Sequence, residues 1–140
     1  MRTVLSVVLR KLLSSLGVCL MMYGLSVTAA GAAQPPANAA RPTQSSLKSL
    51  ITGNSIQGVW AGRPFSQYFS PLGTTDYQET GRQMTSGRWR VNAGGQYCSV
   101  WPPSPSEVCY DVRVLGKSIY WRSGDSYYES HVIDGNVFAQ

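Results

Sequence analysis

The sequence predicts an all-β protein: a small antiparallel meander of about eight short strands, forming a barrel or a sandwich, with one disulfide and a preceding signal peptide. Three observations support this prediction. After Ser55, short alternating runs are separated by turn residues about every eight to twelve positions. Cys98 and Cys109 flank a proline-rich turn. No long helical period competes with the alternation.

Residues 1–33 have the three parts of a secretory signal peptide. Basic Arg2, Arg10 and Lys11 precede an apolar run over 12–27 and small residues over 28–33. We therefore expect cleavage after this leader and a periplasmic or secreted protein that meets the membrane only before cleavage. The alternative is an uncleaved anchor, but its unbroken apolar part is shorter than the roughly 20 residues that a span needs.

Export changes the arguments from cysteine count and charge. Cys19 leaves with the leader, so that an even pair of cysteines remains in an oxidising compartment, where structural disulfides persist. Nine basic and seven acidic residues follow the leader, a net charge of only +2. Nucleic-acid binding needs a concentrated basic surface, and we therefore expect none.

Residues 34–44 are rich in Ala, Pro, Asn, Gln and Thr without apolar period, which predicts a disordered linker. A single helical turn is expected over 46–51, with Ser45 or Ser46 as its cap and Gly53-Asn54 as its stop. The all-β domain then covers 45–140. Its expected strands are 56–61, 65–70, 75–79, 87–91, 96–101, 108–115, 118–122 and 127–133, separated by Gly-, Pro-, Asn- and Asp-rich turns.

The prolines between Cys98 and Cys109 force the chain to turn, because they lack a ladder donor. Antiparallel pairing about this turn places Cys98 opposite Cys109, and Tyr97 opposite Tyr110, in a register that favours a cross-strand disulfide. A zinc site is the alternative, but His131 is the only histidine and a structural zinc needs about four ligands. We expect neither a metal nor a cofactor.

Alternation in this hairpin divides its side chains between two faces. Asp111 and Arg113 share the face of the two cysteines. The opposite face is expected to belong to the core and holds Tyr97, Trp101, Val108, Tyr110, Val112 and Val114.

Five blocks of the sequence carry a resemblance to a known family. They are LITGNSI (50–56), YFSPLGT (68–74), SGRWRV (86–91), YCSVW (97–101) and CYDV (109–112). Their order resembles a family of small exported proteins from alphaproteobacteria that is catalogued only as a domain of unknown function. The resemblance implies a compact β domain without established catalytic residues. A looser similarity, through Gly58-Val59-Trp60, the meander and the disulfide, links the chain to lipocalin-like barrels and to barrel-type periplasmic protease inhibitors.

Catalysis has one candidate base, His131. On a strand Glu129 shares its face, whereas Ser130 points to the other face and is poorly placed as a nucleophile. Pairs of carboxylates such as Asp125 with Glu129 lie at turns, where carboxylates are common. A solvated or hydrogen-bonded strand histidine is the simpler interpretation, and a small hydrolase using His131 stays an alternative.

Aromatic residues favour binding. Beyond the leader the chain has four tryptophans, seven tyrosines and three phenylalanines, more than we expect the core to need. We predict that Trp101 and Trp121, with Tyr120 beside the latter, are exposed and contact a ligand or partner, while Trp60 and Trp89 belong to the core. In the alternative interpretation, all four tryptophans belong to the core. The loop 101–106 is either a preorganised protein-contact loop or only a turn.

Arg88 and Arg90 share a strand face opposite Trp89 and are candidates for an anionic contact site with Arg82 or Arg113. The alternative is a solvated face paired with Asp111 and Glu107.

The sequence thus predicts an exported, monomeric, non-enzymatic binding module for an unknown small apolar ligand or an envelope protein. A barrel-type inhibitor of an envelope or host enzyme is the second hypothesis, and the hydrolase is the third. A deep apolar cavity would favour a carrier, whereas a solid core with an exposed proline loop would favour protein contact.

Overall fold

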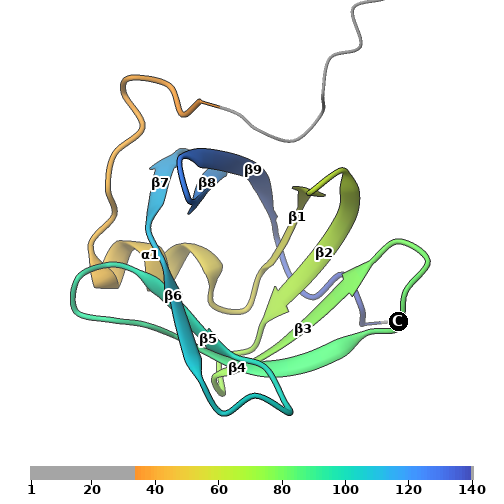
Figure 1. Cartoon of the computed structure of the whole chain (residues 1–140). Coiled ribbons are helices and arrows are strands. Elements are labelled where there is room, and N and C mark those ends of the chain that lie inside the picture. Colours follow the sequence, from red (N-terminus) through yellow and green to blue (C-terminus); the bar gives the residue numbers. More distant parts are fainter. Residues whose placement is uncertain (1–33, 140) are drawn as a thin grey trace, which may run out of the picture.

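The computed structural model describes residues 34–139, in which nine antiparallel strands form one sheet that curls into a nearly closed barrel (Figure 1). The predicted all-β class is confirmed. The predicted signal peptide, residues 1–33, lies outside the described residues. Within the described residues, no helix is long and apolar enough to cross a membrane.

Each strand pairs with its sequence neighbour, except that β1 also pairs with β9 and that β6 and β7 are the two edges of the sheet. The strands are β1 (Ser55–Trp60), β2 (Arg63–Phe69), β3 (Thr74–Glu79), β4 (Thr85–Val91), β5 (Tyr97–Val100), β6 (Glu107–Tyr110), β7 (Val112–Leu115), β8 (Ser118–Ser123) and β9 (Ser126–Ile133).

The barrel closes at Asp111, between the two edge strands. The sequence predicted a single strand over 108–115, but the structure divides it at this residue: β6 pairs with β5, and β7 pairs with β8. The Asp111 carbonyl accepts a hydrogen bond from the Arg122 amide at 2.9 Å. Its carboxylate accepts from Arg41 at 2.7 Å and from Gln96 at 3.1 Å. One bent segment therefore joins the two ends of the sheet.

The helix α1 (Gln44–Ile51) begins two residues earlier than predicted. Thr43, and not Ser45 or Ser46, is its N-cap, because the Thr43 hydroxyl accepts from the Ser46 amide while the Thr43 amide donates to the Ser46 hydroxyl, a reciprocal capping box. Two fully buried residues, Leu47 and Ile51, anchor the helix to the core. The predicted stop is present, with Gly53 in a left-handed conformation at φ 76°.

The prediction of a disordered linker over 34–44 is wrong at its C-terminal end. Ala40 exchanges two backbone hydrogen bonds with Val114, at 3.0 and 2.9 Å, and so pairs with the edge strand β7. Arg41 adds the ion pair with Asp111. Composition alone predicted disorder, but this segment obtains its order from an unpaired strand edge.

The predicted disulfide hairpin is confirmed. Cys98 and Cys109 are bonded, and the register pairs Cys98 with Cys109 and Tyr97 with Tyr110. Inward alternation holds for Tyr97, Tyr110 and Val112, which lie in the core or pack against it. It fails for Val108, which is 48% exposed because edge strand β6 has no neighbour to cover it.

Candidate functional site

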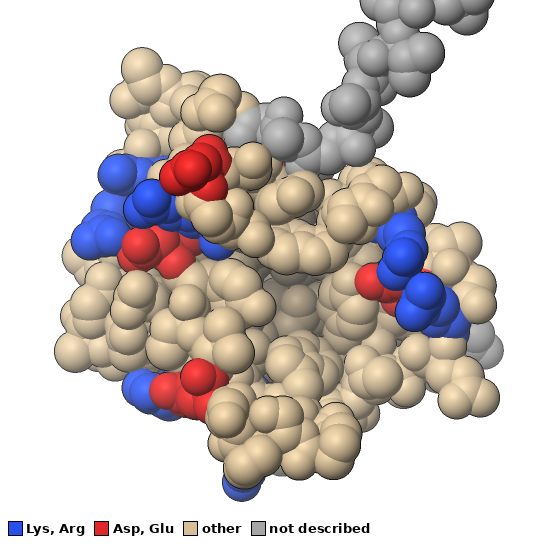
Figure 2. Space-filling view, in the orientation of Figure 1, with Lys and Arg blue, Asp and Glu red and all other residues tan. Residues whose placement is uncertain are grey.

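A cavity of about 340 Å³ occupies the barrel interior. It lies near the end where the hairpin turns 61–62, 80–84 and 124–125 and the loop 101–106 gather, since its lining includes the last residue of β1 and the first of β4. The helix α1 covers the other end, where Gln44 donates to the Val91 carbonyl and Gly53 donates to the Phe69 carbonyl. Figure 2 shows a hollow at the centre of the molecular face, bordered by uncharged side chains. The barrel is therefore closed at one end and hollow at the other.

Aromatic side chains make most of the cavity wall. They come from β1, β2, β3, β5, β6 and β8, together with the start of the 101–106 loop: Trp60, Phe65, Tyr77, Tyr97, Trp101, Tyr110 and Trp121. Several rings contact one another. Phe65 stacks on Tyr77 at 5.3 Å between centroids, and Trp101 meets Tyr77 edge-on at 6.0 Å. These contacts fix the rings before any ligand arrives.

Two glycines leave room on the sheet for two of these rings. Gly87 faces Trp101 across β4 and β5, and a β-carbon on Gly87 would lie 2.7 Å from Cε3 of the indole. Gly58 is paired with Phe65, whose ring would lie 3.1 Å from a β-carbon there. The absence of a side chain lets an aromatic ring cover the backbone of the neighbouring strand.

The floor of the cavity is polar and centres on Gln67, which is buried. Its side-chain nitrogen donates to the Tyr97 hydroxyl and to Thr75 Oγ1, both at 2.9 Å. Thr75 Oγ1 donates in turn to the Tyr68 carbonyl at 2.7 Å, so it must accept from Gln67, and this fixes which end of the amide is the nitrogen. Burial raises the pKa of Tyr97 far above its usual range, so that its phenol stays neutral.

The wall near the mouth has a charged cluster behind Tyr77. The Tyr77 hydroxyl donates to Glu79 Oε1 at 3.2 Å, and Arg63 and Arg82 both reach Glu79 Oε2 at 3.2 Å. Burial, followed by the charge of Glu79, raises the pKa of Tyr77 to about 12. Tyr77 is thus a neutral wall of the cavity at ordinary pH.

The structure places the predicted contact residues unequally. Trp101 lines the cavity and is partly exposed, as predicted, and its indole N–H donates to Ser99 Oγ at 3.1 Å. The predicted exposure of Trp121 and Tyr120 is wrong, since each is only 6% exposed. Trp121 points into the barrel and lines the cavity, where its N–H donates to Ser130 at 2.7 Å. Tyr120, its neighbour on the strand, is not among the cavity residues.

Sequence reasoning missed Gln67, Phe65 and Tyr77. A signal for Gln67 is present in the sequence: it is in phase with Phe65 and Phe69, so the alternation of β2 turns a polar side chain inward with two phenylalanines. A buried polar residue between buried aromatics indicates a site that needs a hydrogen bond. Trp60, predicted to be core, also lines the cavity and packs against Tyr128 in a tilted arrangement with 4.4 Å between ring centroids.

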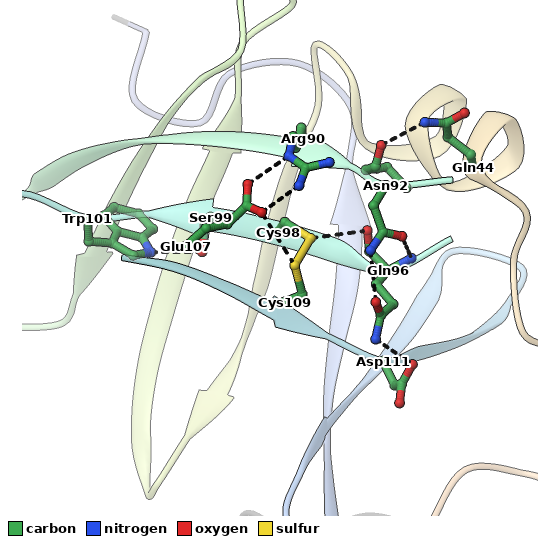
Figure 3. The surroundings of a disulfide bond; sticks show 11 residues. Gln44, Arg90, Asn92, Gln96, Cys98, Ser99, Trp101, Glu107, Cys109 and Asp111 are labelled. Carbon is green, nitrogen blue, oxygen red and sulfur yellow. Dashed lines mark hydrogen bonds and ion pairs between the residues drawn. A yellow bond between two sulfur atoms is a disulfide. The ribbon is translucent and has the colours of Figure 1, made fainter. Parts of the chain in front are cut away.

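Arg88 and Arg90 lie on the outer, exposed face of β4 and do not line the cavity. Arg90 forms a two-pronged pair with Glu107, beside the disulfide (Figure 3). Arg90 lowers the pKa of Glu107 through this hydrogen bond. The pairing with Glu107 matches the alternative interpretation, in which these arginines belong to a solvated face.

A possible metal cluster within the described residues consists of Cys98, Glu107 and Cys109. Its two sulfurs are bonded to each other, so they do not offer the thiolates that a soft metal needs.

His131 has the partners that a hydrolase would require, but in an exposed place. Its Nδ1 lies 3.1 Å from Ser118 Oγ, and its Nε2 lies 3.7 Å from Glu129 Oε1. The Ser118 contact joins neighbouring strands β8 and β9 on the outer face of the barrel, where the His131 side chain is 61% exposed. His131 does not line the cavity. Ser130 points to the opposite face from His131, as predicted, and accepts a hydrogen bond from Trp121 inside the barrel.

Comparison with known proteins identifies a family for most of the chain. The DUF995 family model, described as a protein of unknown function, matches residues 18–135. No curated protein and no solved structure matches the chain. The match confirms the resemblance that the five sequence blocks indicated.

Proposed function

The chain belongs to the DUF995 family, and we propose that it is a non-enzymatic binding protein that holds one small, largely apolar molecule inside its barrel. The observation that carries this proposal is the cavity of about 340 Å³ with its seven aromatic residues. Ligand sites are typically concave, mostly apolar and furnished with a few polar groups, and this volume is near the lower end of their range. Barrels of about eight strands have room for one small ligand.

The arrangement of the loop 101–106 favours a carrier over a protease inhibitor. Pro102 lines the cavity, and Trp101 at the start of the loop forms part of its wall. The loop therefore forms part of the mouth of the cavity, and its rigid prolines define the shape of this opening. A protein inhibitor remains the second proposal, with an envelope or host enzyme as partner and the exposed residues of this loop as the contact.

Turnover has little support in the cavity. Its polar lining consists of an amide and the hydroxyls of Ser, Thr and Tyr, with Tyr77 and Tyr97 held neutral. The triad-like residues around His131 lie on the outer face, where water surrounds them. We therefore propose binding without catalysis, by a monomer that uses neither metal nor cofactor.

The proposed location is the periplasm or the exterior of the cell. The leader supports export, and the Cys98–Cys109 bond supports an oxidising compartment. The proposed ligand is consequently a molecule met in the envelope or outside it.

A fluorescent apolar probe tests the proposal. N-phenyl-1-naphthylamine should bind the protein purified after expression of the full chain, with one site and enhanced fluorescence. In Thr85→Trp, a ring added at the cavity lining should remove this binding. The matched control is Thr74→Trp, an exposed threonine on the neighbouring strand β3 that does not line the cavity.

Loss in Thr85→Trp with retention in Thr74→Trp is the expected result. Absence of saturable binding to the natural sequence, or equal binding by the two variants, would overturn the proposal. Solvent extraction of the purified protein, followed by mass spectrometry, then identifies any molecule that copurifies with it.

A further inference from the structure

In the part of the chain that the structure describes, the side-chain oxygen of Gln67, at the polar floor of the cavity, has no hydrogen-bond partner. Both hydrogen bonds of the Gln67 amide come from its nitrogen, which donates to Tyr97 and Thr75. Within the described residues, Gln67 Oε1 accepts no hydrogen bond, and no side-chain nitrogen or oxygen there is both fully buried and unsatisfied. Gln67 Oε1 therefore reaches open space, and Gln67 lines the cavity.

The orientation of this amide is fixed by its surroundings. A rotation that exchanged nitrogen and oxygen would place Oε1 against Thr75 Oγ1, whose own proton is committed to the Tyr68 carbonyl at 2.7 Å. Two acceptors would then face each other. The amide therefore keeps its carbonyl oxygen available to the cavity.

The walls around this oxygen restrict the shape of an occupant. Trp101 lies close over Gly87, and Phe65 is stacked with Tyr77. These fixed rings leave a space with aromatic side chains on its sides and the Gln67 oxygen at its floor. A planar ring fits such a space by stacking and by edge contacts.

Resting on the proposed binding function, we infer that the ligand is a small planar aromatic molecule that carries an O–H or N–H donor on its edge, and that Gln67 Oε1 accepts this hydrogen. An apolar ring without a donor would leave the Gln67 oxygen desolvated and unpaired. A buried polar group in that state costs about 1 to 3 kcal/mol. Gln67 thereby selects the ligand by hydrogen bonding, and the aromatic wall supplies the apolar contact.

Two probes of nearly equal shape test the inference: 2-naphthol, which has the donor, and 2-methylnaphthalene, which has a methyl group in its place. Each is titrated by displacement of N-phenyl-1-naphthylamine. The measured quantity is the ratio of the two dissociation constants in the natural protein, compared with the same ratio in Gln67→Met. This comparison cancels the different cost of moving each probe out of water.

The preference for 2-naphthol should fall at least about fivefold in Gln67→Met. Gln57→Met is the matched control, because Gln57 is an exposed glutamine on the neighbouring strand β1. It should leave the ratio unchanged. A second readout needs no variant: the ¹³C signal of the Gln67 side-chain carbonyl should move with 2-naphthol and much less with 2-methylnaphthalene.

The outcomes separate this inference from the proposed function. If both probes bind and the ratio is the same in Gln67→Met, or the carbonyl signal responds equally to both probes, the inference is overturned and the binding function stands. If neither probe displaces N-phenyl-1-naphthylamine and that dye itself does not bind, the binding function fails and this inference fails with it.

Discussion

The Trp101 indole lies so close to Gly87 that a β-carbon there would be 2.7 Å from its Cε3 and 2.7 Å from the Val100 carbonyl oxygen. Gly87 is on β4, and Trp101 follows β5, its neighbour. The position of one cavity wall thus depends on a residue without a side chain on the adjacent strand.

Gly87→Ala should displace Trp101 and weaken binding of N-phenyl-1-naphthylamine. Since either the ring or the β5 backbone must move, we also expect a loss of about 1 to 3 kcal/mol in the free energy of unfolding. Titration with the dye and thermal unfolding measure the two effects. Gly94→Ala is the control, because a β-carbon there meets only the Asn92 side chain, at 3.4 Å.

The effects of Gly87→Ala and Trp101→Ala should not add. If Gly87→Ala acts by displacing the Trp101 ring, it should reduce binding and stability less in a protein that already lacks this ring. Additive losses in the double variant would mean that Gly87 acts on the strand backbone and not through Trp101.

Replacing Cys98 and Cys109 together by Ala should lower the thermal midpoint by on the order of 10 °C. A disulfide that closes so short a loop stabilises a protein by about 3 kcal/mol in the chain-entropy model. It also joins the edge strand β6, which pairs with β5 alone, to the sheet. Thermal unfolding of the variant and of the reduced natural protein should agree.

Val108→Ala provides the control for this change, since Val108 is an exposed neighbour on the same strand and should shift the midpoint little. An unchanged midpoint in the double alanine variant would mean that the bond adds nothing to stability.

The fold could be predicted from the sequence where local chemistry decides it. The prolines after Trp101 force a turn, and alternation on both sides then fixes the register that pairs Cys98 with Cys109. The break at Asp111 could not be predicted, because it arises where one segment changes partner from β5 to β8. The pairing of Ala40 with Val114 was hidden for the same reason: long-range pairing, not composition, orders it.

The site was harder to predict than the fold. Aromatic abundance correctly indicated that some rings are not fully packed in the core, and Trp101 is one of them. It did not tell which rings face inward, and the predicted exposure of Trp121 is wrong. Strand phase decides this, and the phase of β8 was uncertain because Ile119, Tyr120 and Trp121 are all apolar or aromatic. All three are buried, so that the run has no clear polar face.

The free energy of unfolding should fall as pH rises from 10 to 12, and Tyr77 should contribute to this fall. Its pKa is about 12 in the folded protein, mainly through burial and then through Glu79, against 10.0 when unfolded. The unfolded chain releases this proton first, so alkali favours unfolding in this range. Chemical denaturation at several pH values measures the slope, which should be smaller in Tyr77→Phe. An identical slope in the variant would contradict the raised pKa.

Asp111→Ala should loosen the junction between the edge strands β6 and β7, where the barrel closes. The carboxylate holds Arg41 at 2.7 Å and Gln96 at 3.1 Å, which ties the segment before α1 and the turn before β5 to the point where β6 becomes β7. Because the ion pair is largely exposed, we expect a loss of only about 1 kcal/mol in the free energy of unfolding. The effect on amide hydrogen exchange should be larger: exchange should become faster at Ala40 and Val114, because their pairing depends on this anchor.

Asp125→Ala, in the exposed turn between β8 and β9, is the control and should change neither the free energy of unfolding nor the exchange rates. Unaltered exchange at Ala40 and Val114 in Asp111→Ala would mean that strand pairing alone orders the segment, and that Asp111 closes the barrel only through its backbone.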